Sequence, residues 1–183
     1  MAKIIFMKSK GLVHMSFSKK NSGGFTLIEL LIVIAIIGIL ASVVLGSLNT
    51  ARTKATDAAI KANLTNLRGM ASIWYDDNAQ VYASAGNEYA SSTCPTTASS
   101  GNIFADTKMF SGISEAYTKS GGVANSKCVA SATTWAVAVQ LKSSDGAGSE
   151  PDSWCVDSVG ASRSYEYGAG GISNAIDAND VCL

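Results

Sequence analysis

A single acidic residue, Glu29, lies inside a long apolar run near the start of the chain. No charged residue follows it from Leu30 to Ala51, a stretch of about 33 Å in a helix, which is enough to cross the roughly 30 Å hydrocarbon core of a bilayer. An ionised carboxylate at that depth is costly unless it is paired, so Glu29 is a candidate functional residue. The alternative is a glutamate at the edge of a span that reaches the lipid headgroups.

Two glycines, Gly23 and Gly24, directly precede Phe25 at the start of the apolar run. Small residues in this place suit a protease that must accept an extended backbone. A cut between Gly24 and Phe25 would place the new α-amino group one helical turn from Glu29, and this amine is positively charged near neutral pH. The carboxylate could then pair with the amine of its own chain or of a neighbouring one.

The residue types needed for enzymatic chemistry are sparse. The only histidine is His14, so no Ser-His-Asp or Cys-His arrangement can be built, and no nucleotide-binding glycine loop is present. We therefore predict a protein that is not an enzyme and that has no cofactor and no metal site. The run at 173–180 offers oxygen ligands that suit calcium, but its spacing does not match an EF-hand and a solvated loop is the better interpretation. Its candidate ligands are Asn174, Asp177, Asn179 and Asp180. Three tryptophans could form a carbohydrate platform, but their helix and strand positions favour a place in the core; they are Trp74, Trp135 and Trp154.

The four cysteines all follow the apolar run, at Cys94, Cys128, Cys155 and Cys182. An even number in a Ser/Thr/Gly/Ala-rich region indicates two disulfides in an oxidising compartment, whereas a metal site usually needs closer pairs. Four cysteines allow three connectivities. We choose sequential pairing because it closes the shortest loops.

Charge is distributed unevenly along a chain whose formal net charge is zero. Residues 1–24 carry five lysines and no acid, which leaves nine of the fourteen basic residues against all fourteen acidic ones in the remainder. A nucleic-acid-binding protein would carry its basic residues on the folded part, so this class is not favoured. Lysines flanking a membrane span stay in the cytoplasm, so the distribution fits a single-pass anchor with the rest of the chain outside.

The pattern after residue 48 predicts an α+β fold in which one long helix packs on an antiparallel sheet. No proline interrupts 25–78, and an apolar stripe at helical spacing marks the second half of this helix. The stripe consists of Ile60, Leu64, Leu67, Ala71 and Trp74. We predict a leader at 1–24, an apolar helix half at 25–48 and a head at 49–183. The head comprises an amphipathic helix half at 49–78, a loop at 79–133 with one short helix at 106–121, and a sheet with an irregular tail at 134–183. The sheet should hold about four strands, including one at 134–142 with alternating apolar residues and a hairpin around Gly160.

The stretch KKNSGGFTLIELLIVIAIIGILAS, residues 19–42, closely resembles the N-terminal signal and helix of type IV pilins and of the related pseudopilins of type II secretion. The resemblance is strong over residues 19–60 and looser beyond. It implies that a prepilin peptidase cuts after Gly24, that Phe25 becomes the N-methylated first residue, and that Glu29 pairs with the Phe25 amine of a neighbouring subunit. It also implies a transmembrane helix that includes Leu30, Gly38 and Leu45, and a disulfide-closed region between Cys155 and Cys182.

The family resemblance implies a structural subunit that is inserted in the inner membrane, cleaved, and extracted into an extracellular filament for adhesion, motility or DNA uptake. Its expected partners are copies of itself, the prepilin peptidase, the membrane, and the pilus assembly platform with its ATPase. Two features depart from the family: many members have proline where this chain has Gly46, at which we expect a soft spot, and the leader is long unless translation starts at Met15. The alternatives are a pseudopilin or minor pilin and, more remotely, a secreted binding module with an ordinary signal peptide.

Overall fold

The computed structural model describes residues 24–143, 152–165 and 171–183. The leader predicted at 1–24, apart from Gly24, lies outside the described residues, as does most of the turn-rich link expected at 144–152. The chain divides into two compact units, residues 1–43 and 44–183, which are described separately below. The boundary predicted at residue 48, where the hydrophobic pattern of the helix changes, remains a prediction.

A single helix, α1 (Leu27–Asp77), spans 51 residues and agrees with the long helix predicted at 25–78. The first half of α1 is apolar on all sides. A helix suits such a segment in lipid because it satisfies all of its own backbone hydrogen bonds. Gly46 lies within α1 without a break in the helix. The loosening expected at Gly46 concerns an assembled filament and stays a prediction.

The head, residues 44–183, is built on an antiparallel five-stranded sheet, which confirms the α+β class. Its strands are β1 (Tyr89–Ser92), β2 (Ser126–Ala130), β3 (Trp135–Gln140), β4 (Ser153–Asp157) and β5 (Ser162–Tyr165). They lie in the order of the sequence, so each strand pairs with its neighbour along the chain. The hairpin predicted around Gly160 is β4–β5, and the strand predicted at 134–142 is β3.

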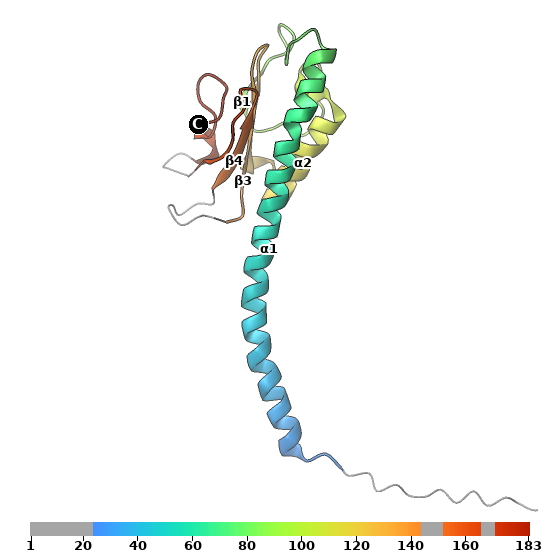
Figure 1. Cartoon of the computed structure of the whole chain (residues 1–183), viewed down its shortest axis with the longest axis vertical. Helices are drawn as coiled ribbons and strands as arrows, with labels where there is room; N and C mark the ends of the chain where they lie inside the picture. The colour runs from blue at the N-terminus through green and yellow to red at the C-terminus, as the bar shows by residue number, and fades with distance from the viewer. Residues whose placement is uncertain (1–23, 144–151, 166–170) are drawn as a thin grey trace, which may run out of the picture. The chain divides into compact units, whose positions relative to one another are not determined.

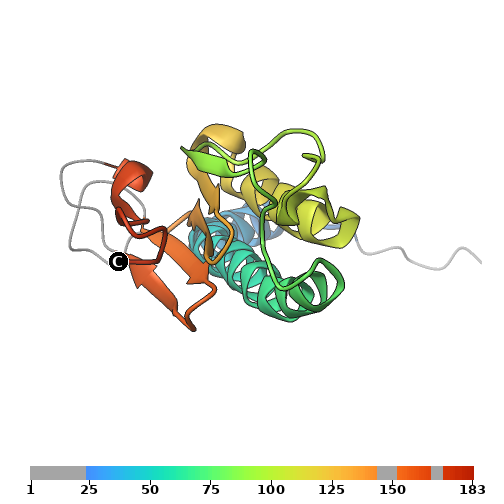
Figure 2. The ribbon, with the colours of Figure 1, turned by 90° about the horizontal axis from the view of Figure 1, so that it is seen from above.

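Both faces of the sheet are covered. The second half of α1 and the helix α2 (Thr107–Ser120) lie side by side along one face (Figures 1 and 2). There the predicted stripe is buried together with alternate residues of β3: Ile60, Leu64, Leu67, Ala71, Trp135, Val137 and Val139. On the opposite face a smaller core joins the other β3 residues, Ala136 and Ala138, to Cys155, Ile176 and Cys182. Trp135 lies in the core as predicted, and Trp74 and Trp154 pack against it half-buried.

The prediction that residues 79–133 form a loop around one short helix was wrong in part. The short helix is α2, but β1 and β2 also lie in this range, as do the 3₁₀ helices η1 (Ile103–Ala105) and η2 (Val123–Asn125). Both strands are short, β1 with four residues and β2 with five, and neither sequence alternates clearly between apolar and polar residues, so they carry almost no period-2 signal. β2 is extended in the structure because it pairs with β3 along its whole length, with Cys128 opposite Val137.

Two disulfides fasten the sheet to its surroundings. Cys94 is bonded to Cys128 of β2, and Cys155 of β4 is bonded to Cys182 near the C-terminal end. The C-terminal segment, which includes the 3₁₀ helix η3 (Gly171–Asn174), has further attachments. The buried Asp157 accepts a hydrogen bond from the Cys182 amide at 2.9 Å, and Arg163 donates one to the Cys182 carbonyl. The tail that appeared irregular from its sequence is therefore held to the sheet at several points.

Candidate functional site: the start of the N-terminal helix

The start of α1 brings together the residues that the sequence selected. Gly24, Phe25 and Thr26 precede the helix in an irregular conformation, and Glu29 lies in its first turn. Thr26 is the cap: its backbone N–H and its Oγ1 donate to Glu29 Oε2 at 2.9 and 2.8 Å. The Glu29 amide donates back to Thr26 Oγ1 at 3.3 Å. This reciprocal arrangement is a capping box, which satisfies amide groups that have no partner inside a helix.

The Glu29 carboxylate has capacity left after capping. Both hydrogen bonds from Thr26 reach Oε2, and among the described residues none donates to Oε1. Glu29 is exposed, as is Phe25, whose exposed fraction is 83%. A negative charge at this end is also favoured by the helix dipole. The site therefore presents one carboxylate oxygen and an aromatic side chain outward, beside the Gly24–Phe25 peptide bond.

Sequence reasoning missed Thr26, although the signal was present. Thr26 and Glu29 form the pattern Thr-x-x-Glu before an apolar run, which is the sequence signature of a capping box. The argument from the sequence considered only an α-amino group as a partner for Glu29, either of its own chain or of a neighbouring one. The structure corrects this, since the side chain is already hydrogen-bonded to Thr26.

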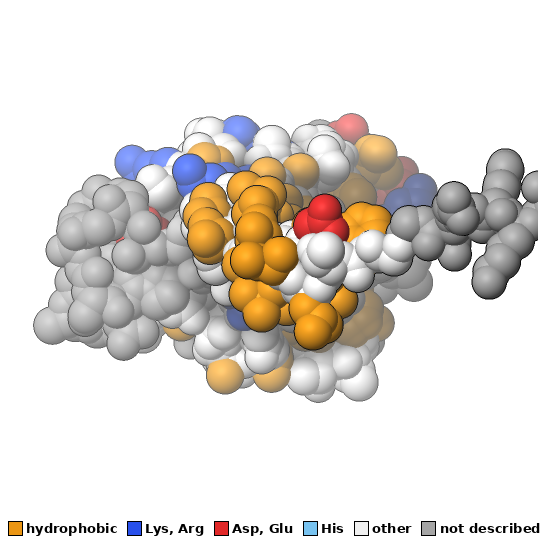
Figure 3. Space-filling view, turned by 90° about the horizontal axis from the view of Figure 1, so that it is seen from below, with side chains coloured by type: hydrophobic (Ala, Val, Ile, Leu, Met, Phe, Trp, Pro, Cys, Tyr) orange, Lys and Arg blue, Asp and Glu red, His pale blue; other side chains and the backbone are white. Residues whose placement is uncertain are grey.

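The helix half that follows the site exposes its side chains on all sides. Leu30 and Leu45 are 58% and 66% exposed, and nothing lies within 4 Å of the place that a Cβ on Gly38 would take. Hydrophobic side chains dominate the middle of the face seen in Figure 3, around one acidic side chain. By length and composition α1 could cross a membrane: the mean hydropathy of its most apolar window is 3.0.

The other candidate residues are engaged in local structure. Asp177 accepts hydrogen bonds from the amides of Asn179 and Val181, at 2.8 and 3.1 Å, and so closes the turn before Cys182. The bond from the Val181 amide lowers the pKa of the Asp177 carboxyl below its usual value. No group of three or more His, Cys, Asp or Glu side chains suited to a metal ion occurs within 24–143, 152–165 and 171–183.

A known protein family matches this end of the chain. A family described as "Prokaryotic N-terminal methylation motif" matches residues 19–45. The chain is also 48% identical over 59 residues to the type IV wide pilus major component PilA4 of Thermus thermophilus. That match covers 32% of this chain and 45% of the relative, so the chain spans less than half of the relative's length. No solved structure matches the chain significantly.

The methylation motif covers the peptide bond, the cap and the carboxylate of the candidate site. The long helix on an antiparallel sheet is a pilin-like architecture. The chain therefore carries the prokaryotic N-terminal methylation motif and is similar, over 59 residues, to a type IV pilus component.

Proposed function

We propose that the chain is a prepilin, a structural subunit that is cut between Gly24 and Phe25, N-methylated on Phe25, and polymerised into a type IV pilus. The observation that carries the proposal is the free oxygen Oε1 of Glu29, which is exposed in the first turn of a helix whose start lies within the methylation motif. A carboxylate with one satisfied and one unsatisfied oxygen requires a further donor when water is excluded. The Phe25 amine of a second copy is a donor of the right charge.

The pairing would set the register between neighbouring helices. Packing of apolar helices against each other is non-directional, since any sliding of one helix along another buries similar surface. A buried Glu29 without its amine would be costly, so registers that separate the two charges are penalised. The contribution of the ion pair is therefore specificity of assembly rather than strength.

The apolar half of α1 would serve two environments in succession. In the precursor it is a span of the inner membrane, with the lysine-rich leader in the cytoplasm and the head outside. In the filament the same exposed side chains pack against other copies. The partners that follow are the prepilin peptidase, other copies of the chain, and an assembly platform with its ATPase.

The experiment is intact-mass and N-terminal mass spectrometry of filaments sheared from cells that express the chain. We expect a subunit that starts at Phe25 and carries one additional methyl group. A mature protein that starts in the forties would instead indicate an ordinary signal peptide and would contradict the proposal. In Gly24→Val we expect the uncut precursor to accumulate in the membrane, whereas a processed product of unchanged mass would show that the cut lies elsewhere.

A further inference from the structure

One of the three tryptophans differs from the others in its surroundings. Trp74, near the C-terminal end of α1, packs half-buried against the core of the head and also borders two hollows on the surface. By contrast, Trp135 lies inside the core with 1% of its surface exposed. The ring of Trp154 already has the Lys61 ammonium over it, with Nζ 4.7 Å from the ring centroid. Trp74 is therefore the tryptophan that is best placed to meet a ligand.

The first hollow lies between the last turns of α1 and the start of α2 and has a volume of about 220 Å³. Both apolar and polar side chains line it, including Met70, Ile73, Trp74, Asp77, Asn78 and Lys108. Binding sites for small molecules typically combine a largely apolar surface with a few polar groups that fix the orientation of the ligand. The first hollow has this composition.

The second hollow adjoins the first, because Trp74, Asp77 and Asn78 line both. Its volume is about 360 Å³, and one of its walls consists of the chain that follows α1 and the segment paired with it. The Ser84 amide donates to the Gly101 carbonyl at 2.9 Å within this wall. The wall is therefore preformed, which lowers the entropic cost of binding a ligand.

The indole N–H of Trp74 is a buried donor without an acceptor. Its Nε1 has no hydrogen-bond partner among the described residues. Most buried polar groups in proteins do have a partner, so an unpaired N–H requires an explanation. Trp135 and Trp154 have the same unpaired group, but neither of them borders the two hollows. At Trp74, an oxygen atom of a ligand in one of the hollows could supply the missing acceptor.

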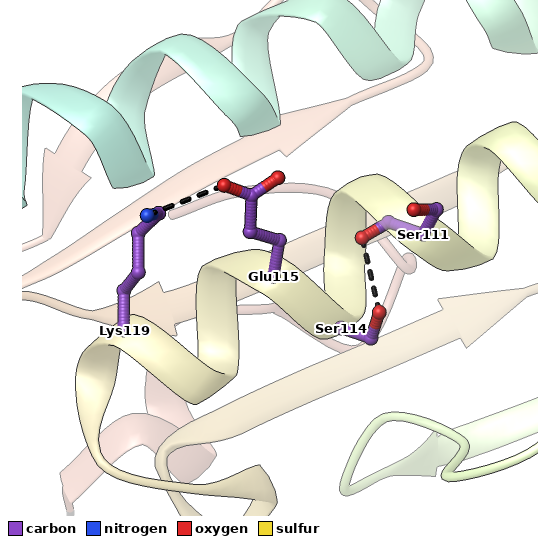
Figure 4. A network of polar contacts seen from close by, with 4 residues as sticks. All are labelled: Ser111, Ser114, Glu115 and Lys119. Carbon is purple, nitrogen blue, oxygen red and sulfur yellow. Dashed lines mark hydrogen bonds and ion pairs between the residues drawn. The ribbon is translucent and has the colours of Figure 1, made fainter.

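Two charged groups of the first hollow are free of ion pairs within the described ranges. The ion pair recorded between described residues lies further along α2, where Lys119 is 3.2 Å from Glu115 (Figure 4). Lys108 at the start of α2 and Asp77 at the end of α1 have no such partner there. A further carboxylate, Asp106, already accepts hydrogen bonds that cap α2. One free cation and one free anion suit hydroxyl groups, which both donate and accept, better than a ligand of one charge.

We propose that the two hollows beside Trp74 form a binding site for a neutral oligosaccharide. A sugar ring has a face of C–H groups and a rim of hydroxyls. The C–H face can pack on tryptophan, which offers a large apolar surface together with a polar N–H. The hydroxyls can accept from Lys108 and from the indole N–H and donate to Asp77. Because the two hollows adjoin, the site suits a chain of sugars rather than a single ring.

This inference goes beyond the proposed function and does not rest on it. The site belongs to the head alone and lies at the opposite end of α1 from Glu29. Binding can therefore be measured on isolated subunits, with no filament present.

The test uses the full chain in a zwitterionic detergent, since a detergent with a sugar headgroup would compete for the site. Calorimetric titration with cellohexaose, maltohexaose and N-acetylated chitohexaose measures binding of three neutral oligosaccharides. We expect saturable binding of at least one of them. In NMR spectra of isotope-labelled protein, the same sugar should shift the indole N–H signal that is absent from Trp74→Phe.

Substitutions locate the site. Trp74→Phe keeps a ring against the core but removes the N–H and part of the apolar surface, and it should weaken binding at least tenfold. Asp77→Ala removes an exposed carboxylate and should also weaken binding at least tenfold. Asp76→Ala is the matched control, because Asp76 is equally exposed but does not line the two hollows, and it should bind as the wild type does. Thermal unfolding followed by circular dichroism checks that each variant is folded.

The outcomes separate this inference from the proposed function. Absence of saturable binding of all three hexasaccharides would overturn the site, as would wild-type binding by both folded variants Trp74→Phe and Asp77→Ala. The prepilin proposal would stand in either case, because the mass of the mature N-terminus tests it. A subunit that binds the sugar but starts in the forties would overturn the prepilin proposal and leave the site in place.

Discussion

At the scale of single residues, Thr26 and Glu29 combine two tasks at one helix end. The carboxylate closes the first turn of α1 through Oε2, and its other oxygen points to no donor among the residues described. Capping a helix is worth about 1 kcal/mol and needs only an acceptor, whereas pairing with an amine needs the charge. Substitutions can therefore separate the two tasks.

Three substitutions make this separation. Glu29→Val removes cap and charge, Glu29→Gln keeps an oxygen acceptor but no charge, and Thr26→Val keeps the charge but removes the hydroxyl. If the ion pair governs assembly, both Glu29 variants should lose at least tenfold in sheared filaments while the protein still inserts in the membrane. Thr26→Val should assemble. Filaments counted by electron microscopy, with subunit levels from immunoblots, provide the measurement.

The reverse order would contradict the role of the charge. Normal filaments from Glu29→Gln together with loss in Thr26→Val would show that the capping box, and not the ion pair, is what assembly needs.

At the scale of elements, the sequence predicted what local patterns determine. The apolar stripe from Ile60 to Trp74 predicted α1 and its buried side, and alternation in β3 predicted a strand with Trp135 inside. β1 and β2 were missed because four and five residues with small or polar side chains carry no such pattern. Contacts between distant segments could not be predicted from such patterns either. Asp57 of α1 accepts hydrogen bonds from Lys142 and Ser143, which lie 85 and 86 positions further along the chain.

The candidate site was predicted unevenly for the same reason. Gly24, Phe25 and Glu29 were selected as candidates because their residue types are conspicuous at the edge of an apolar run. Thr26 needed a geometric pattern, and the free oxygen Oε1 could be seen only with coordinates. Likewise, only coordinates distinguish an exposed glycine such as Gly69 from a packed one such as Gly112.

Asp57 offers a test of how α1 holds the sheet. This buried carboxylate accepts from the Lys142 amide at 2.6 Å and from the Ser143 amide at 3.1 Å, just after β3. Asp57→Ala leaves both amides without that partner, and a hydrogen bond to a charged group contributes roughly 1.5–3 kcal/mol. We expect the free energy of unfolding to fall by about 2 kcal/mol or more, measured by chemical denaturation of the full chain in detergent.

Asp57→Asn is the matched control, because its amide oxygen can still accept one of the two bonds, and it should lose less than Asp57→Ala. A stability of Asp57→Ala within about 0.5 kcal/mol of the wild type, the range of ordinary surface changes, would show that these bonds do not hold the sheet to α1.

At the scale of the whole molecule, the two disulfides close separate parts of the head. The bond between Cys155 and Cys182 spans 27 residues, and the bond between Cys94 and Cys128 spans 34. In the chain-entropy description a loop of this size corresponds to about 3–4 kcal/mol. Replacing either pair by serine should lower the free energy of unfolding by about that amount.

The two losses should add, because the bonds fasten different strands. Denaturation of the two double variants and of the variant without cysteines measures this. Losses that are strongly non-additive would show that the bonds stabilise one shared region rather than two separate ones.

The strand order has a consequence for how the head is made. Because β1 to β5 pair in the order of the sequence, each new strand finds its partner already synthesised, and α1 precedes them all. The pairings of β2 with β3, β3 with β4 and β4 with β5 join strands that follow each other closely in the sequence, and contacts of this kind favour fast folding. A chain that leaves the ribosome or crosses a membrane from its N-terminal end could therefore build its sheet one strand at a time. The Cys94–Cys128 disulfide can form only after β2 has been made, and the Cys155–Cys182 disulfide only after the C-terminal segment has been made.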